Sequence, residues 1–368
     1  MKFAGRLLFS IVFLGLIIGA GADVGSVFEG DWSNPNRGAP ENIFAFCEFK
    51  DTFESQSTLW EAHFEDGSYF YGYFFNYKFA SYKKWGVTAV VINPDGKRYI
   101  EKVELPSKDL RFSRDSIDLR FGSFWQNGEY PAYRFHVDTP GFLADLTYKN
   151  LVPPFIPGDG YTWYDAGKKT FLKNVAFCPW GEVAGIIGVG GKRRQVKGQG
   201  YADHDHANQI FTKQIKEMHT YRGWPADPDN GYSISFVEYI GGPQYSGLRA
   251  RWLILMKKGS IVMATRDFTV TRSNFVKDDS TGFEYPQRWQ LEARAPGGTL
   301  VGGWKKSKLI DVLDVFNELP APLQPIARSF FTRPVFYRMT GTFEGLFNSG
   351  EDQIPIKVEG LCKAVYTK

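Results

Sequence analysis

Two aspartates and two histidines stand in four consecutive positions of the segment GQGYADHDHANQ, residues 198–209, in a chain with five histidines in all. Histidine titrates near neutral pH, a buried aspartate can be brought to do so, and both residue types bind metal ions. Alternation along a β-strand sends Asp203 and Asp205 to one face and His204 and His206 to the other. The segment therefore predicts a strand with a chemically active face.

Short aromatic or β-branched runs separated by turn residues dominate the chain. Examples are SYFYGYFFNYKF at 68–79, after an Asp-Gly pair, and VTAVVI at 87–92, before Pro-Asp-Gly. Such runs predict antiparallel strands joined by tight turns, and so many strands must close or stack to hide their edges. Helix is scarce, and the one apolar stripe with helical spacing consists of Leu309, Val312, Leu313 and Phe316. It predicts a short helix in the C-terminal domain.

The length of 368 residues suits two domains. Residues 1–22 combine a basic start, an apolar run and a small-x-small end, which predicts a signal peptide and a secreted or periplasmic protein; an N-terminal membrane anchor is the alternative. The polar stretch at 273–282 interrupts the strand pattern. It predicts a division into one domain at 23–270 and another at 271–368.

Charge and cysteine content exclude several function classes. Removal of the two basic residues of the signal peptide lowers the formal charge from +4 to +2, since 42 bases then face 40 acids, and no nucleic-acid partner is indicated. Cys47, Cys178 and Cys362 are far apart and show no CxxC spacing. A zinc ribbon is excluded, and whether any two of the three form a disulfide is open.

A longer series of motifs carries a family resemblance. WGEVAGIIGVGGKRRQVKGQGYADHDH is followed by GYSISFVEYIGG, RARWLILMKKGSIV, GFEYPQRWQL, YRMTGTFEGLF and IKVEGLCKAVY. The order of these segments resembles the carotenoid 1,2-hydratase (hydroxyneurosporene synthase) and AttH-like group, which is similar to fungal cyclases and to a eukaryotic lipid-binding survival-factor family. The resemblance implies an all-β fold of two lipocalin-like antiparallel β-barrels, with an apolar ligand in or between them.

The resemblance also implies residue roles. Gly198, Gly200, Tyr201, Asp203 and His204 match the family motif, in which the histidine is implicated in hydration. The family then has Asn-Trp-Gly, where this chain has Asp-His-Ala at 205–207.

On a later strand the hydratases carry a tyrosine and an aspartate two positions apart, and Phe236 and Glu238 occupy those places here. Adding water to a C=C bond requires an acid that protonates it, a pocket that tolerates a carbocation and a positioned water. A carboxyl group in an apolar lumen has a raised pKa, so Glu238 is the predicted proton donor, while His204 orients or deprotonates the water; Asp203 is a third candidate catalytic residue.

Tyr201, His206, Phe236 and Trp224 are the predicted ligand-binding residues. Simpler interpretations stand beside these: Tyr201 as a packed barrel residue, Asp203 as a tie to a backbone turn, and Glu238 as an exposed strand acid.

Two function classes are open from the sequence. The protein binds an apolar isoprenoid, polyene or acyl lipid and either hydrates, cyclises or isomerises it, or only carries it, with contact to a membrane surface during ligand exchange. No cofactor is expected. A rival interpretation of the DHDH segment is a zinc site, in which His204 and His206 chelate the ion together with His219 or a carboxylate.

Overall fold

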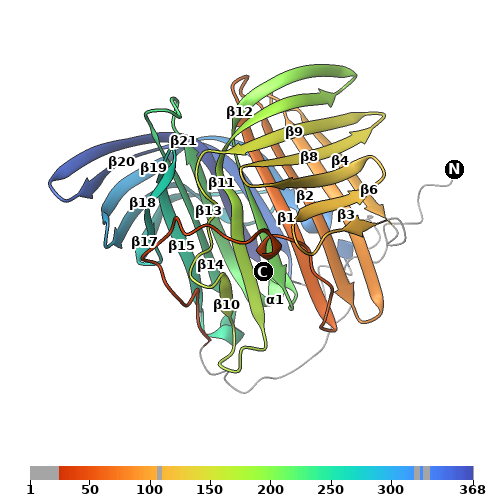
Figure 1. Ribbon diagram of the computed structural model, residues 1–368, viewed down its shortest axis with the longest axis horizontal. Coiled ribbons are helices and arrows are strands. Elements are labelled where there is room, and N and C mark those ends of the chain that lie inside the picture. Colours follow the sequence, from red (N-terminus) through yellow and green to blue (C-terminus); the bar gives the residue numbers. More distant parts are fainter. Residues whose placement is uncertain (1–24, 106–109, 319–323, 326–331, 368) are drawn as a thin grey trace.

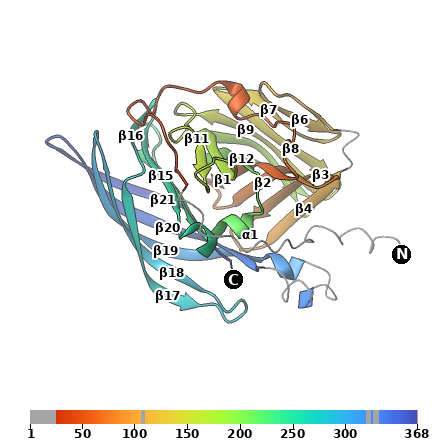
Figure 2. The same cartoon turned by 90° about the horizontal axis from the view of Figure 1, so that it is seen from below.

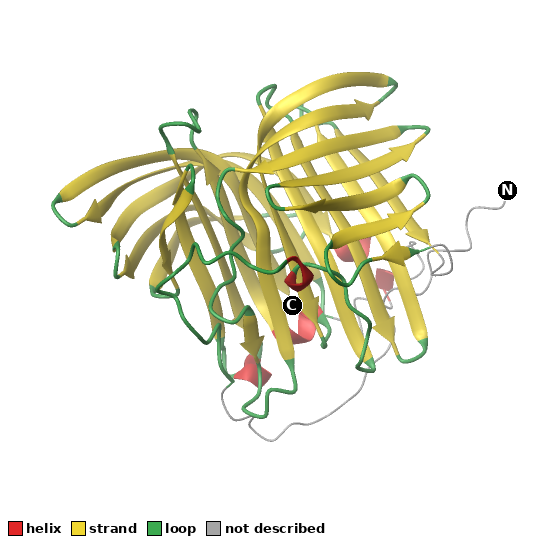
Figure 3. Ribbon diagram, viewed as in Figure 1, coloured by secondary structure: helices red, strands yellow, loops and turns green. Residues whose placement is uncertain are grey.

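The computed structural model describes residues 25–105, 110–318, 324–325 and 332–367, which form two antiparallel β-sheets side by side (Figure 1). Strand accounts for most of the described chain (Figure 3), so the all-β prediction is confirmed. The predicted signal peptide lies outside the described residues. Within the described part of the chain, no helix is both long and apolar enough to cross a lipid bilayer.

The first sheet has the strand order β4-β3-β2-β1-β12-β11-β9-β8-β7-β6-β5, with β10 paired to β11. Its strands are β1 Phe53–Phe64, β2 Tyr69–Phe79, β3 Tyr82–Ile92, β4 Arg98–Leu105, β5 Arg111–Phe112, β6 Ile117–Phe121, β7 Phe124–Glu129, β8 Ala132–Thr139, β9 Phe142–Asn150, β10 Tyr161–Trp163, β11 Phe171–Val189 and β12 Lys192–Ala207.

The second sheet has the order β16-β15-β14-β13-β21-β20-β19-β18-β17. Its strands are β13 Ile215–Trp224, β14 Tyr232–Gly241, β15 Arg249–Lys257, β16 Ser260–Thr265, β17 Phe268–Lys277, β18 Glu284–Ala295, β19 Gly298–Asp314, β20 Pro334–Ser349 and β21 Asp352–Thr367. The helical elements include the 3-10 turns η1 Glu41–Ile43, η3 Pro243–Tyr245 and η4 Val315–Glu318, and α1 Phe211–Gln214, which joins the two sheets.

Each sheet curls around its own apolar core (Figure 2). In the first barrel, Thr139 of β8 donates a hydrogen bond to Glu101 of β4 (3.0 Å), across the open side of the sheet. In the second, Thr265 of β16 donates one to the backbone carbonyl of Arg294 on β18 (2.6 Å). Because aromatic and aliphatic side chains fill both interiors, neither barrel is an empty lumen.

The convex faces of the two barrels pack against each other around a third apolar cluster, which draws residues from both sheets. Polar contacts cross the same interface. Trp252 of β15 donates its indole N–H to Asn174 of β11 (2.7 Å), and Tyr71 of β2 donates to Asp311 of β19 (2.9 Å). The barrels are therefore joined by a buried interface that contains polar groups as well as apolar ones.

The predicted helix in the C-terminal domain is wrong for most of its length. Leu309, Val312 and Leu313 lie in strand β19, and Phe316 lies in the 3-10 turn η4. The pairing of β19 with β20 shifts register twice, between Lys306 and Lys308 and between Leu309 and Asp311. A bulge adds one residue and breaks the alternation of faces, so the apolar residues take a spacing that imitates a helix.

The two sheets divide the chain at a different place from the expected domain boundary. The first sheet ends at Ala207 and the second begins at Ile215, whereas residue 270 falls inside β17 of the second sheet. The polar stretch at 273–282 belongs to the end of β17 and its hairpin with β18. The polar composition of 273–282, which suggested a linker between domains, therefore belongs to a hairpin within the second barrel.

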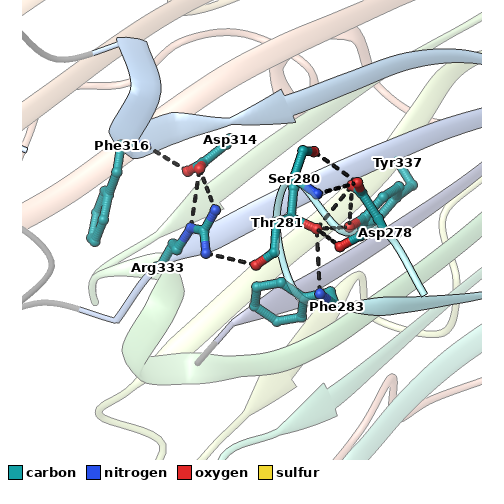
Figure 4. Close-up of polar contacts among 8 residues, drawn as sticks. All are labelled: Asp278, Ser280, Thr281, Phe283, Asp314, Phe316, Arg333 and Tyr337. Carbon is teal, nitrogen blue, oxygen red and sulfur yellow. Dashed lines mark hydrogen bonds and ion pairs between the residues drawn. The ribbon is translucent and has the colours of Figure 1, made fainter.

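That hairpin is fixed to the neighbouring strands by polar contacts (Figure 4). Asp278 accepts hydrogen bonds from the hydroxyl groups of Thr281 (2.8 Å) and Tyr337 (3.0 Å). Arg333 pairs with Asp314 through Nε (3.1 Å) and donates to the backbone carbonyl of Thr281 (2.7 Å). The end of β19 and the start of β20 are thereby held to the β17–β18 turn.

Candidate functional site

Strand β12, which carries the DHDH segment, lies in the middle of the first sheet between β1 and β11. Its two glycines allow a close approach to β1. A Cβ atom at Gly198 would lie 2.0 Å from the carbonyl oxygen of His63, and one at Gly200 would lie 2.5 Å from that of Glu61. The Gly-x-Gly part of the motif therefore serves the packing of β12 rather than its chemistry.

The predicted alternation of the DHDH segment is confirmed. Asp203 and Asp205 line a cavity between the two barrels, whereas His204 and His206 point into the first barrel. The cavity has a volume of about 410 Å³, within the range of small-molecule sites. Its lining draws on both sheets. It combines apolar and aromatic residues, which include Leu59, Tyr73, Leu172, Phe211, Met218, Val237, Tyr239 and Phe336, with the cations Arg98, Lys102, Arg222, Arg338 and Lys363.

A hydrogen-bonded network holds the two carboxyl groups at this cavity. Asn174 donates its amide N–H to Asp205 Oδ1 (2.7 Å), and its own carbonyl is fixed by Trp252. Tyr201 donates its hydroxyl to Asp203 Oδ2 (2.8 Å). The other oxygen of Asp203, Oδ1, accepts no hydrogen bond from any described residue. Both aspartates are therefore held in place, and one buried oxygen is left for a ligand or a water.

Burial and mutual repulsion make these carboxyl groups weak acids. Burial, and then the neighbouring Asp203 carboxylate, raise the pKa of Asp205 to about 8. Burial also raises the pKa of Asp203, although the Arg222 guanidinium and the Tyr201 hydroxyl oppose the rise. Asp205 is partly accessible because it lines the cavity, yet protein atoms surround it. Burial and the neighbouring carboxylate therefore favour the protonated form of Asp205.

Two cations face the same network from the second sheet. The guanidinium of Arg222 on β13 lies 3.8 Å from the ring centre of Tyr201 and donates to the backbone carbonyl of Phe236 (2.6 Å). Lys363 of β21 lies with its Nζ 3.8 Å from Glu61 Oε1 of β1. These cations balance part of the negative charge that an ionised Asp203 brings to the interface.

His204 does not reach this cavity. It is buried in the first barrel, where its ring lies 5.5 Å from that of Phe46. Burial lowers its pKa well below the usual value, and the charges of Lys173 and His206 act in the same direction. A neutral, enclosed His204 cannot orient a water beside Asp203 across the sheet.

Glu238 and Phe236 face the interior of the second barrel, because Val237 and Tyr239 take the cavity side of β14. Burial raises the pKa of Glu238, but its ion pairs with Arg272 and with Arg249 (3.2 Å) outweigh burial, and its net pKa is lowered. Glu238 is thus an ion-paired carboxylate, and the expected pairing of Glu238 with His204 in one cavity does not occur.

The remaining predicted ligand residues are dispersed. Phe236 packs on Trp289 in the second barrel (5.3 Å between ring centres). Trp224 lines a separate, open groove of about 680 Å³ with several charged residues. His206 contacts Cys47 and Glu54 inside the first barrel. Only Tyr201, through its bond to Asp203, belongs to the inter-barrel network.

The zinc hypothesis finds no ligand set in the structure. His219 lies on β13 of the second sheet, where its Nε2 is 3.3 Å from Glu217 Oε2. Among the described residues, no group of three or more His, Cys, Asp or Glu side chains is arranged to hold a metal ion. The three cysteines are free thiols.

Sequence reasoning missed Asp205 as a residue of the cavity, together with Asn174, Arg222 and Tyr239. The signal for Asp205 was present, since alternation places it on the same face as Asp203. No sequence signal indicated the other three. Asn174 lies opposite Asp205 through the pairing of β11 with β12, whereas Arg222 of β13 and Tyr239 of β14 approach through the packing of the two barrels.

The chain matches one protein-family model by sequence and several solved structures by fold. The model of the Svf1 family matches residues 97–362. No curated protein matches the chain by sequence. An AttH-type protein of Nitrosomonas europaea superposes with a TM-score of 0.59 at 15% identity, over 91% of this chain and 97% of that one.

Two further solved structures share the fold. CghA in complex with Sch210972 superposes with a TM-score of 0.63 at 12% identity, over 95% of this chain and 98% of that one. Kievitone hydratase from Nectria haematococca gives 0.54 at 13% identity, over 93% and 97%. The two-domain lipocalin-like fold and the expected kinship with the AttH-like group are confirmed. None of these matches specifies a carotenoid as ligand.

Proposed function

Because the chain belongs to the Svf1 family and shares its fold with a hydratase, we propose that it binds an apolar isoprenoid, polyene or acyl lipid between its two barrels and transforms it by acid–base chemistry. The acid-catalysed routes of hydration, cyclisation and isomerisation share protonation of a C=C bond as their first step. Asp205 is the proposed acid, in place of Glu238.

The observation that carries this proposal is the position of Asp205, a carboxyl group held by Asn174 on the wall of a largely apolar cavity between the barrels. A carboxylic acid with a pKa of about 8 keeps its proton at neutral pH and can still release it in the transition state. The lining of aromatic and aliphatic side chains fits a hydrocarbon ligand. Both barrel interiors, by contrast, hold clusters of aromatic and aliphatic side chains.

The proposed step balances without a cofactor. The Asp205 carboxyl group gives its proton to one carbon of the double bond, and the π electrons form the new C–H bond. The aromatic faces of Tyr73 and Tyr239 stabilise the carbocation. In hydration, a water then adds to the cation and returns a proton to the carboxylate. Ser57, which pairs with Asp205 across β1 and β12, and Thr220 provide hydroxyl groups at the cavity to hold that water.

A second candidate function is non-catalytic carriage of the same ligand. It is favoured by the bonding of the carboxyl groups, since Tyr201, Asn174 and Trp252 form a network that also stabilises the interface. Both candidates place the ligand in the same cavity, so binding alone does not separate them.

Two variants test the proposal. Ser57→Trp fills the cavity beside Asp205, and Thr147→Trp adds the same side chain to the exposed face of β9 as a control. A fluorescent polyenoic fatty acid should bind wild type and Thr147→Trp with micromolar affinity, about −8 kcal/mol, and bind Ser57→Trp at least about tenfold more weakly. Equal affinity for all three proteins would place the ligand elsewhere.

Extraction of the purified protein with organic solvent identifies a co-purified ligand as the candidate substrate. With that substrate, Asp205→Asn should bind normally and lose turnover by about a hundredfold or more, since it keeps the shape and removes the acid. Unchanged turnover would exclude Asp205 as the acid, and no turnover by wild type would favour the carrier.

Export of the protein is part of the proposal and is supported by the basic and apolar start of the chain. N-terminal sequencing of the protein from its native host should find a chain that begins near Asp23. A chain that retains residues 1–22 would favour the membrane anchor.

A further inference from the structure

Cys47, His206 and Glu54 form a cluster inside the first barrel that the proposed lipid chemistry does not use. Cys47 Sγ lies 3.8 Å from His206 Nδ1, and His206 Nε2 lies 3.3 Å from Glu54 Oε1. The thiol, the imidazole and the carboxylate thus stand in line, with each ring nitrogen facing one partner. This is the arrangement by which an acid orients a histidine that takes the proton of a nucleophile.

The backbone around the cluster fixes its geometry. Gln56, which lies opposite His206 on β1, accepts a hydrogen bond from the Cys47 N–H and donates one to the Cys47 carbonyl, both at 2.8 Å. Glu54 Oε2 accepts hydrogen bonds from the backbone N–H groups of Lys50 and Asp51. The segment before β1 is therefore tied to the barrel so that the sulfur faces the histidine.

Charge favours a thiolate and an imidazolium in this cluster. Burial raises the pKa of Cys47, but the hydrogen bond and charge of His206 and the charge of Lys173 outweigh it, and the net pKa is lowered. Burial lowers the pKa of His206, but Cys47 and Glu54 raise it above the usual value. The two shifts are the two sides of one proton transfer from sulfur to nitrogen.

The other two thiols of the chain are a contrast. Cys178 and Cys362 are buried, and burial raises the pKa of both, to about 12 for Cys362. Cys47 is only half-buried. Of the three cysteines, Cys47 is therefore the one whose sulfur is both partly accessible and favoured to ionise.

We propose that Cys47, His206 and Glu54 form a reactive thiolate site whose substrate is a small hydroperoxide. Neither the inter-barrel cavity nor the Trp224 groove includes Cys47, so a small reactant fits this half-buried sulfur better than a long-chain one. Because the Cys47 N–H is already bonded to Gln56, it is not available to stabilise an oxyanion, which disfavours acyl transfer.

The step is a two-electron oxidation. The Cys47 thiolate attacks one oxygen of hydrogen peroxide, an S–O bond forms and the O–O bond breaks. The leaving hydroxide takes the His206 proton and departs as water. The sulfur becomes a sulfenic acid and the peroxide is reduced. Cys178 and Cys362 are enclosed elsewhere, so an external thiol is required to reduce the product.

Other titratable groups around the sulfur set its pH dependence. Lys173 of β11 donates to the backbone carbonyl of Ile43, and burial lowers its pKa to about 8. Tyr161 of β10 and His204 of β12 complete the surroundings of Cys47 and His206. As the pH rises through 8, Lys173 loses its charge, so the charge that favours the thiolate weakens only above neutral pH.

The experiment treats the purified full chain with hydrogen peroxide, traps sulfenic acid with dimedone and identifies the modified peptide by mass spectrometry. The adduct should lie on Cys47 and be absent from Cys178 and Cys362. At pH 6, His206→Gln should slow Cys47 labelling by about tenfold or more, since an ordinary thiol is almost fully protonated there. His136→Gln, a histidine replacement on β8 that leaves the cluster intact, should not change the rate.

Alkylation of the wild-type protein with iodoacetamide across pH needs no variant, which guards against a misfolded His206→Gln protein. The rate at Cys47 should reach half its maximum at a lower pH than that of an ordinary thiol, which does so near pH 8.5. A midpoint near 8.5, an equal rate in His206→Gln, or equal labelling of Cys178 would each overturn the proposal.

Discussion

Replacement of Asp205 by asparagine should make the stability of the protein less dependent on pH. Burial and the neighbouring Asp203 carboxylate raise the pKa of Asp205 from 3.8 to about 8, which corresponds to at most about 6 kcal/mol. Because Asp205 is partly exposed and Asp203 shares the titration, we expect on the order of 2 kcal/mol. Because the pKa is raised in the folded protein, the contribution of protonated Asp205 to the free energy of unfolding is complete below about pH 4 and is lost as the pH rises through 8.

Urea unfolding of wild type and Asp205→Asn at pH 5, 7 and 9 measures the effect. The free energy of unfolding of Asp205→Asn, relative to wild type, should rise by about 2 kcal/mol between pH 5 and 9, because only wild type must ionise a buried acid. Asp118→Asn, at an exposed aspartate of β6, is the control and should show no such trend. A constant difference between wild type and Asp205→Asn would refute a protonated Asp205 and with it the proposed acid.

Two other variants probe structural roles. Glu238→Gln should destabilise the protein by about 3 kcal/mol at pH 7, since it leaves Arg272 without its buried partner, and should not alter ligand affinity. Because the ion pairs lower the pKa of Glu238 from 4.5, the difference in unfolding free energy should fade as the pH falls below about 5. Urea unfolding of wild type and Glu238→Gln across this pH range measures the difference. Thr281→Val should lower the free energy of unfolding by about 1–2 kcal/mol through loss of the hydrogen bond to Asp278, and an unchanged urea midpoint would show that this contact is dispensable.

The sequence carried enough information for the fold class and for part of the candidate site. Turns at Asp66-Gly67, Gly190-Gly191 and Lys258-Gly259 were predictable because each places glycine where φ is positive. The alternation of Asp203 and His204 was predictable from strand geometry alone.

The partners of each face were not predictable, because they depend on how the two sheets pack. Alternation says that Glu238 and Tyr239 point apart, but only the packed structure shows that Tyr239 faces the inter-barrel cavity and Glu238 faces Arg272. The bulges in β19 were hidden for a similar reason, since they depend on pairing with β20.

Photo-crosslinking with a diazirine-bearing fatty acid tests most directly the central claim that an apolar ligand lies between the barrels. Mass spectrometry of the irradiated protein should locate adducts on cavity residues such as Leu59, Val237 and Tyr239, and Ser57→Trp should abolish them. Adducts on interior residues of either barrel, such as Trp60 or Trp289, or adducts that persist in Ser57→Trp, would contradict the account.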